Sequence, residues 1–299
     1  MKKPVFYLVL LFAPLAGWAQ AGISGEIKAD YVPFSNYVRP IDSVKTNSKS
    51  NFKRIQGSLE IPLSLKLTED NKPKLWSLYL QGSYAEMENK YYDENLFPTR
   101  LLNTQVGVKH IRPLRGKWSI MAMTSVGVYT DMENITIDDV LLQGGVIFIK
   151  SFNPNLAFGF GPVLTNAFGV PMIMPGLYFN WELQGAFHFK VAFPEGLEIG
   201  YRMNPNFDLK AVVEMDGMTA EINENGKSKL LGYQQIMTGL RPQFKLGEHW
   251  TIELTGGSTL ARSFQTNDRK ISSIFKEKNI ADPRFTTTFY GAVALKWKF

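Results

Sequence analysis

Apolar and polar residues alternate with a period of two through almost the whole chain, in segments of about ten residues. The segment 55–67 shows the pattern most clearly. Its apolar positions are Ile55, Leu59, Ile61, Leu63, Leu65 and Leu67. Gln56, Ser58, Glu60, Ser64 and Lys66 lie between them. A period of two places these sets on opposite faces of a β-strand. The sequence therefore predicts strands with one face in an apolar medium.

The last segment alternates in the same way up to the chain end. Phe289, Val293, Leu295, Trp297 and Phe299 share one face, and Lys296 and Lys298 lie on the other. A terminal Phe on such a strand resembles the C-terminal signature of outer-membrane proteins, which their insertion machinery reads. We expect Trp297 and Phe299 to form this assembly signal and the barrel-assembly machinery to be a partner.

The spacing of the segments predicts about 14 strands, an even number as single-chain bacterial barrels require. They are expected at 22–34, 53–67, 74–87, 100–112, 117–131, 139–150, 155–168, 171–182, 186–193, 197–203, 207–217, 228–244, 249–265 and 284–299. Short turns alternate with longer polar loops between them. The fold class is an all-β, transmembrane, antiparallel up-and-down β-barrel, with 12 strands as the alternative. The count depends on 186–193 and 197–203 being two strands.

The N-terminus has the features of a secretory signal peptide. Lys2 and Lys3 precede a short apolar stretch, and Ala19 and Ala21 are small residues suited to cleavage. We expect residues 1–20 to be a signal peptide and 21–299 to form the barrel. The chain carries +6, which removal of the two lysines lowers by two, and it has no cysteine. The absence of cysteine excludes disulfides and thiol chemistry. The mildly basic net charge does not indicate nucleic-acid binding.

Aromatic residues recur at strand ends on the apolar face. They are Tyr31, Trp76, Trp118, Trp181, Tyr201, Trp250 and Trp297. Amphipathic aromatic rings form girdles where lipid meets water. Together with the export signal, this pattern favours a barrel in the cell outer membrane over a soluble β-sandwich. Three prolines, Pro62, Pro162 and Pro242, fall inside expected strands, so we expect a bulge or break at each.

Two phrases carry a family resemblance, 176–182 (GLYFNWE) and 193–201 (FPEGLEIGY). With the pattern of the whole mature chain, they resemble the domain-of-unknown-function families of outer-membrane β-barrels in Gram-negative bacteria. The resemblance implies the fold and the outer-membrane location. It brings no catalytic residues.

No constellation for catalysis or metal binding is expected. None of the three histidines, His110, His188 and His249, has a partner at metal-ligand spacing. The sequence therefore predicts no enzyme, no cofactor and no metal. Two basic loops, Arg39–Arg54 and Arg269–Lys278, are suited either to lipopolysaccharide phosphates or simply to solubility. Outer-membrane lipid and lipopolysaccharide are the expected surroundings.

The strand face opposite the apolar stripe is the expected lumen. One wall carries interleaved charges, and these are Glu198, Arg202, Asp208, Lys210, Glu214, Arg241 and Glu253. The opposite wall, with Met121 and Met123, is apolar or small. Two functions remain open. One is a channel or transporter for small amphipathic or hydrophobic cargo, with weak ion selectivity. The other is a closed structural or adhesion barrel without transport.

Overall fold

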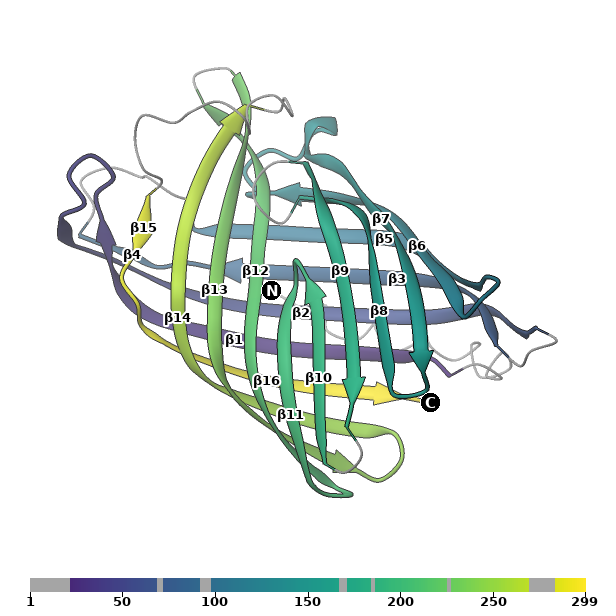
Figure 1. Ribbon diagram of the computed structural model, residues 1–299. Helices are drawn as coiled ribbons and strands as arrows, with labels where there is room; N and C mark the ends of the chain where they lie inside the picture. Colours follow the sequence, from purple (N-terminus) through teal and green to yellow (C-terminus); the bar gives the residue numbers. More distant parts are fainter. Residues whose placement is uncertain are drawn as a thin grey trace, which may run out of the picture.

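The computed structural model describes residues 22–68, 72–91, 98–166, 171–183, 186–224, 227–268 and 283–299. These residues form one antiparallel sheet that closes on itself (Figure 1). The expected signal peptide and the basic residues 269–278 lie outside them. The only described helical turn is η2 (Ile137–Asp139), and no helix of the described part is long and apolar enough to cross a membrane.

Fourteen long strands make the barrel wall. They are β1 (Ser24–Val38), β2 (Lys45–Leu67), β3 (Pro73–Glu86), β5 (Arg100–Pro113), β6 (Trp118–Thr130), β7 (Val140–Asn153), β8 (Leu156–Thr165), β9 (Met172–Glu182), β10 (Phe187–Phe193), β11 (Gly196–Asn204), β12 (Phe207–Glu224), β13 (Lys227–Leu246), β14 (Trp250–Asp268) and β16 (Phe289–Lys298). Two-residue strands, β4 (Asn89–Lys90) and β15 (Arg284–Phe285), lie near the loop ends of longer strands: β4 pairs with β2, and β15 pairs with β1 and β14. The predicted class and the strand count of 14 are confirmed.

Each long strand pairs with its neighbours in chain order, and β1 closes the barrel by pairing with both β2 and β16. Short connections, such as 154–155 and 205–206, lie at one end of the barrel, which we call the turn end. The longer connections, including 39–44 and 131–139, lie at the other, the loop end. The expected division between 186–193 and 197–203 is confirmed, because a turn at Pro194 and Glu195 separates β10 from β11.

The register fixes which side chains point inward. Cross-strand partners share a face of the sheet. In β1 and β16, Glu26 pairs with Lys296 on the inner face, and Ile27 pairs with Leu295 on the outer face. The expected outward position of Ile55 holds, since its side chain is exposed on the outer wall.

A bulge in β2 overturns part of the expected alternation. Pro62 pairs with Ser77, but Ser64 pairs with Trp76, so one residue of β2 has no partner there. Beyond an extra residue, the two faces of a strand exchange. Ser64 therefore shares the outer face with Trp76, and Leu65 lies inward. The prediction that 55–67 keeps one apolar face is wrong for Leu65 and Leu67.

The other two strand prolines also interrupt the sheet. The ladder between β7 and β8 stops at Gly145–Val163 and resumes at Phe148–Phe160, on either side of Pro162. The ladder between β13 and β14 likewise skips Pro242 and the residue before it. Proline has no N–H to donate, which accounts for each interruption. The expected bulge or break is confirmed at all three prolines.

The half of the barrel nearest the loop end is filled by side chains. Phe52 of β2 stacks on Tyr233 of β13 at 4.3 Å between ring centroids, although these strands are not neighbours in the sheet. Strand β12 leans across to the opposite wall, where Glu221 bridges to Thr130 of β6. The buried cluster holds Val32, Tyr37, Phe52, Ala85, Met87, Leu101, Met218, Ala220, Leu231, Tyr233, Met237, Phe264, Phe285 and Tyr290. We call this cluster the loop-half core.

A second bulge places Arg262 within this half. Ile236 pairs with Ala261 but Met237 pairs with Thr259, so Leu260 is the extra residue of β14. The guanidinium of Arg262 donates to the backbone oxygens of Ser50 and Asn51, at 2.9 Å each, across the barrel. These contacts join the two walls and leave the open interior to the turn half.

Candidate functional site: the charged interior

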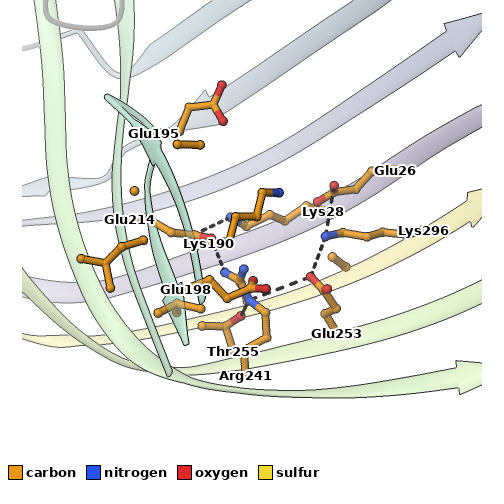
Figure 2. Close-up of a pocket in the computed structure, with 16 residues that line it drawn as sticks. Glu26, Lys28, Lys190, Glu195, Glu198, Glu214, Arg241, Glu253, Thr255 and Lys296 are labelled. Atoms are coloured by element: carbon orange, nitrogen blue, oxygen red, sulfur yellow. Dashed lines mark hydrogen bonds and ion pairs between the residues drawn. The ribbon is translucent and has the colours of Figure 1, made fainter. Parts of the chain in front are cut away.

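An ion-pair network lines the turn half of the barrel (Figure 2). Lys210 contacts Glu198 at 3.1 Å and Glu253 at 3.5 Å. Arg241 pairs with Glu214 at 2.5 Å and lies 3.9 Å from Glu253. Five of the seven charged residues expected in the lumen thus meet in one network that crosses strands β11 to β14. Pairing across strands stabilises charges that would each be costly alone.

The other two expected charges lie apart from this network. Arg202 and Asp208 are 4.0 Å apart near the short turn between β11 and β12, and the Arg202 side chain is 53% exposed. Asp208 instead pairs closely with Lys245, at 2.8 Å. These residues belong to the rim of the turn end.

Sequence reasoning also missed partners on the first and last strands. Lys28 contacts Glu214 at 3.4 Å, and Lys296 contacts Glu253 at 2.8 Å and Glu26 at 3.7 Å. Alternation in 22–34 and 284–299 places these residues on the polar face. That signal could have found them, but their proximity to Glu214 and Glu253 follows only from barrel closure.

Three cavities occupy the unfilled interior. The charged cavity, of about 310 Å³, is enclosed by the network. The connecting cavity, of about 280 Å³, lies beside Gln56, Ser58 and Gln81. The mixed cavity, of about 250 Å³, extends toward β8 and the loop half. Glu195 lines all three, so the cavities meet at its side chain.

Glu195 is the residue that sequence reasoning missed most clearly. It follows Pro194 in the tight turn between β10 and β11, and the sequence marks that position only as a turn. Figure 2 shows its carboxylate standing apart from the ion-pair network. Within the described residues it makes no ion pair and no side-chain hydrogen bond, unlike Glu198, Glu214 and Glu253.

The mixed cavity combines polar and apolar lining residues. The polar residues include Gln56, Gln81, Gln105, Asn103 and Gln143. The apolar residues include Met123, Val163, Leu164, Pro194 and Met215. Met121, the other methionine expected in the lumen, pairs with Ile111 on the same inner face nearer the turn end.

Small residues let the apolar wall pack closely behind this cavity. A Cβ at Gly176 would come within 2.6 Å of side-chain atoms of Ile147 and Val163. The glycine therefore permits β9 to lie against β7 and β8 on the inner face. The expectation of a small, apolar wall in this region describes these residues well.

A second buried charge cluster lies where the mixed cavity meets the loop-half core. The Arg54 guanidinium contacts Asp30 at 2.6 Å and also pairs with Asp216. Arg54 and Asp30 are almost completely buried. Tyr290 donates to Asp30 at 3.3 Å. Arg54 therefore does not belong to an exposed basic loop, whether for lipopolysaccharide phosphates or for solubility, because its charge is satisfied inside the barrel.

The histidines serve as hydrogen-bonding or stacking groups. His188 lies 3.1 Å from Glu198, and His110 stacks on Trp76 at 3.9 Å between ring centroids. His249 lies 2.9 Å from the backbone oxygen of Lys298. Among the residues described, no group of three or more potential ligands is arranged to hold a metal ion.

The protein is a closed antiparallel β-barrel with a charged interior. Outer-membrane barrels of Gram-negative bacteria have this architecture. Residues 16–298 match the family described as Domain of unknown function (DUF6268), and the chain belongs to that family. No curated protein matches the chain.

Several solved barrels are similar in fold. The TodX deltaS2S3 mutant, a monoaromatic hydrocarbon channel, is 9% identical, with 95% of this chain and 92% of that chain covered and a TM-score of 0.41. OccAB4 from Acinetobacter baumannii is 10% identical, covering 95% and 99%, with a TM-score of 0.31. The outer-membrane protease OmpT from Escherichia coli is 10% identical, covering 93% and 97%, with a TM-score of 0.27.

Proposed function

We propose that this protein is a non-enzymatic channel or transporter of the cell outer membrane, for small amphipathic or hydrophobic molecules. The observation that carries the proposal is the set of three cavities that meet at Glu195 inside the barrel. A barrel that serves only as a rigid support has no need of this unfilled interior. Small-molecule sites commonly combine an apolar lining with a few placed polar groups.

The outer wall supports the membrane location. Large apolar side chains such as Leu240, Leu254 and Val293 point outward and are more than 40% exposed. Trp76, Trp250 and Trp181 add aromatic rings to this surface near the turn end. Contiguous apolar surface of this kind is stable against hydrocarbon and unfavourable in water. Lipid and lipopolysaccharide are therefore the surroundings we propose.

The mixed cavity supports the amphipathic class of cargo. The amide groups of its lining can hydrogen-bond a polar head, and the side chains of Met123 and Val163 can contact an apolar body. The charged cavity adds five carboxylates and four cationic side chains along its lining. Lys210, which pairs with Glu198 and Glu253 in the same network, balances the fifth carboxylate, so a head without net charge fits this cavity best.

A closed structural or adhesion barrel is the second candidate. The loop-half core favours it, because its side chains fill the barrel from wall to wall. The turn half does not fit this candidate, since a sealed barrel would be expected to fill its interior there too.

Reconstitution of the purified protein in planar bilayers tests the proposal. We expect small conductance steps, together with uptake of the apolar fluorescent probe N-phenyl-naphthylamine into vesicles that contain the protein. Vesicles without protein set the background. Absence of both conductance and uptake would overturn the transport function and leave the structural one.

Replacing Glu195 by Gln should lower the preference of the conducting protein for cations. The change removes the carboxylate at the junction of the three cavities. No cationic side chain among the described residues forms an ion pair with this carboxylate. Acidic side chains along a passage favour cations. The reversal potential in a potassium chloride gradient measures the effect. Glu248→Gln, in the turn before β14, is the control and should leave the potential unchanged.

A further inference from the structure

Among the described residues, no strand continues the barrel wall above the β10–β11 hairpin. The pairing of β9 with β10 ends at Leu177–Phe193, and the pairing of β11 with β12 ends at Gly196–Glu214. Strands β9 and β12 both continue toward the loop end without a described strand between them (Figure 1). At the hairpin, three strand spacings of about 4.8 Å separate them, or roughly 14 Å.

The free edge of β9 is marked in the sequence by a proline. Pro175 lies opposite Pro162 in the β8–β9 ladder, and neither can donate an N–H. This pair must be of the non-hydrogen-bonded kind, so the backbone of Pro175 faces the side where β10 is missing. Proline is a residue that natural sheets place at unpaired edges. The unpaired edge of β9 is therefore encoded in the sequence.

Contacts on β12 define the other limits of the gap. At its lower border, the backbone N–H of Met215 donates to the backbone oxygen of Glu195 at 2.8 Å. At its upper border, the Thr219 hydroxyl donates to the backbone oxygen of Asn166, whose side-chain amide donates to the backbone oxygen of Leu142 at 3.1 Å. The opening lies between these two contacts.

The mixed cavity extends to this opening. Its lining includes the end of β8 on one side, the β10–β11 turn below and the residues Met215–Gly217 of β12 on the other side. Leu164, Met215 and Gly217 occupy outward positions in their strands, since they alternate with inward Val163 and Asp216. Leu164 also lines a shallow apolar depression on the outer wall. The mixed cavity and this outer depression therefore lie on either side of the end of β8.

The route along the barrel axis toward the loop end is blocked by packed side chains. The rings of Phe52 and Tyr233, the guanidinium of Arg262 and the side chain of Leu101 are buried in the loop half. A molecule in the mixed cavity therefore meets packed side chains toward the loop end. Toward the side it meets the end of β8, the β10–β11 turn and the residues Met215–Gly217 of β12. Irregular backbone at membrane depth is tolerated where it lines a water-filled cavity.

We propose that the gap between β9 and β12 is a lateral opening, through which the apolar part of an amphipathic molecule passes between the interior and the surrounding hydrocarbon. This inference rests on the proposed transport function for its cargo, but the opening itself can be tested without transport. The Leu164 side chain and the Pro194–Glu195 turn form its borders, and the amide groups of the mixed cavity hold the polar end of the cargo inside.

Fluorescence quenching by lipids brominated on their acyl chains tests the opening. The chain has no cysteine, so each introduced cysteine can be labelled singly with bimane. A label at Val163→Cys, on the inner wall, should be quenched nearly as strongly as one at Leu254→Cys on the outer wall. A label at Ser58→Cys, beside the connecting cavity, should not be quenched. Thr165→Cys gives a second labelling site if the Val163 variant does not assemble.

A bulky residue at the border should close the opening. Gly217→Phe should lower quenching at Val163→Cys severalfold and leave quenching at Leu254→Cys unchanged. Gly256→Phe is the matched control, because a Cβ there meets open space on the outer wall. An unquenched label at Val163 in a conducting protein would overturn the lateral opening and leave the channel. A quenched label in a protein without conductance or probe uptake would uphold the opening and overturn transport.

Discussion

At the scale of single residues, the Arg54 cluster is where buried charge is most concentrated. Arg54 joins Asp30 of β1 to Asp216 of β12, two strands on different walls. Removing the cation leaves two carboxylates without their partner, and the Asp30 side chain is fully buried. Breaking a buried pair in this way costs about 3–5 kcal/mol. The cluster therefore links barrel stability to the position of β12.

Arg54→Met should destabilise the folded barrel by about that amount, measured by urea unfolding in lipid vesicles. Arg39→Met is the control, because Arg39 pairs with Asp42 in an exposed loop and its loss should be barely detectable. A double change, Arg54→Met with Asp216→Asn, should recover part of the lost stability. Equal unfolding midpoints for the Arg54 and Arg39 variants would contradict the buried role.

The charged positions illustrate what sequence can supply at this scale. Alternation placed Lys210, Glu214, Arg241 and Glu253 on one face, and the structure brings them together. Arg262 could not be placed in the same way. The extra residue at Leu260 exchanges the faces of β14, and nothing in the local pattern marks the bulge. Partners that are distant in the chain, such as Asp30 and Asp216, depend on closure.

At the scale of elements, the register of β16 decides which residues face lipid in the proposed membrane setting. Val293 lies outward and is 47% exposed, and its neighbour Ala292 lines the charged cavity. Val293→Arg should cost about 2–4 kcal/mol near the middle of a bilayer. Ala292→Arg places the same charge near Glu214 and Glu253 and should cost much less. The free energy of unfolding of both variants can be measured in lipid vesicles. An equal loss of stability for Val293→Arg and Ala292→Arg would contradict the register.

Strand boundaries were predictable where the alternation is strong, and less so near the loop end. The strands β3, β5, β6, β9, β10 and β11 begin and end close to the expected positions. Strand β12 continues to Glu224, although 217–227 was expected to be a loop, and β2 begins at Lys45 instead of 53. The β2 extension is mostly polar, since strands beyond the apolar layer no longer need an apolar face. The β12 extension instead contributes Met218 and Ala220 to the loop-half core.

At the scale of the whole molecule, the chain end completes the barrel. The backbone N–H of Phe299 donates to the backbone oxygen of Ile23 at 2.9 Å, and its ring contacts Trp250 edge-on at 5.8 Å. The last residue therefore joins the start of the first strand to β14 across β16. This geometry is consistent with the terminal aromatic also being read by the barrel-assembly machinery, which we keep as a proposal.

Deleting Phe299 should sharply lower the amount of folded protein in the outer membrane, because both the closing contact and the proposed assembly signal are lost. The measurement is the heat-modifiable band in isolated outer membranes. Phe289→Ala, at the other end of β16 and strongly exposed, is the control and should assemble nearly as well. Normal levels of the truncated protein would show that closure does not need this residue.

If the gap is the proposed lateral opening, the length of the β10–β11 hairpin sets the size of molecule that can pass through it. With strands of 7 and 9 residues, this hairpin is much shorter than β12, which has 18. Each residue added to both strands would raise the turn by about 3.3 Å, less the strand tilt. Two or three such additions would bring Glu195 toward Asn166 and close the gap. Relatives with hairpins of different length would thus differ in cargo size while keeping the same barrel.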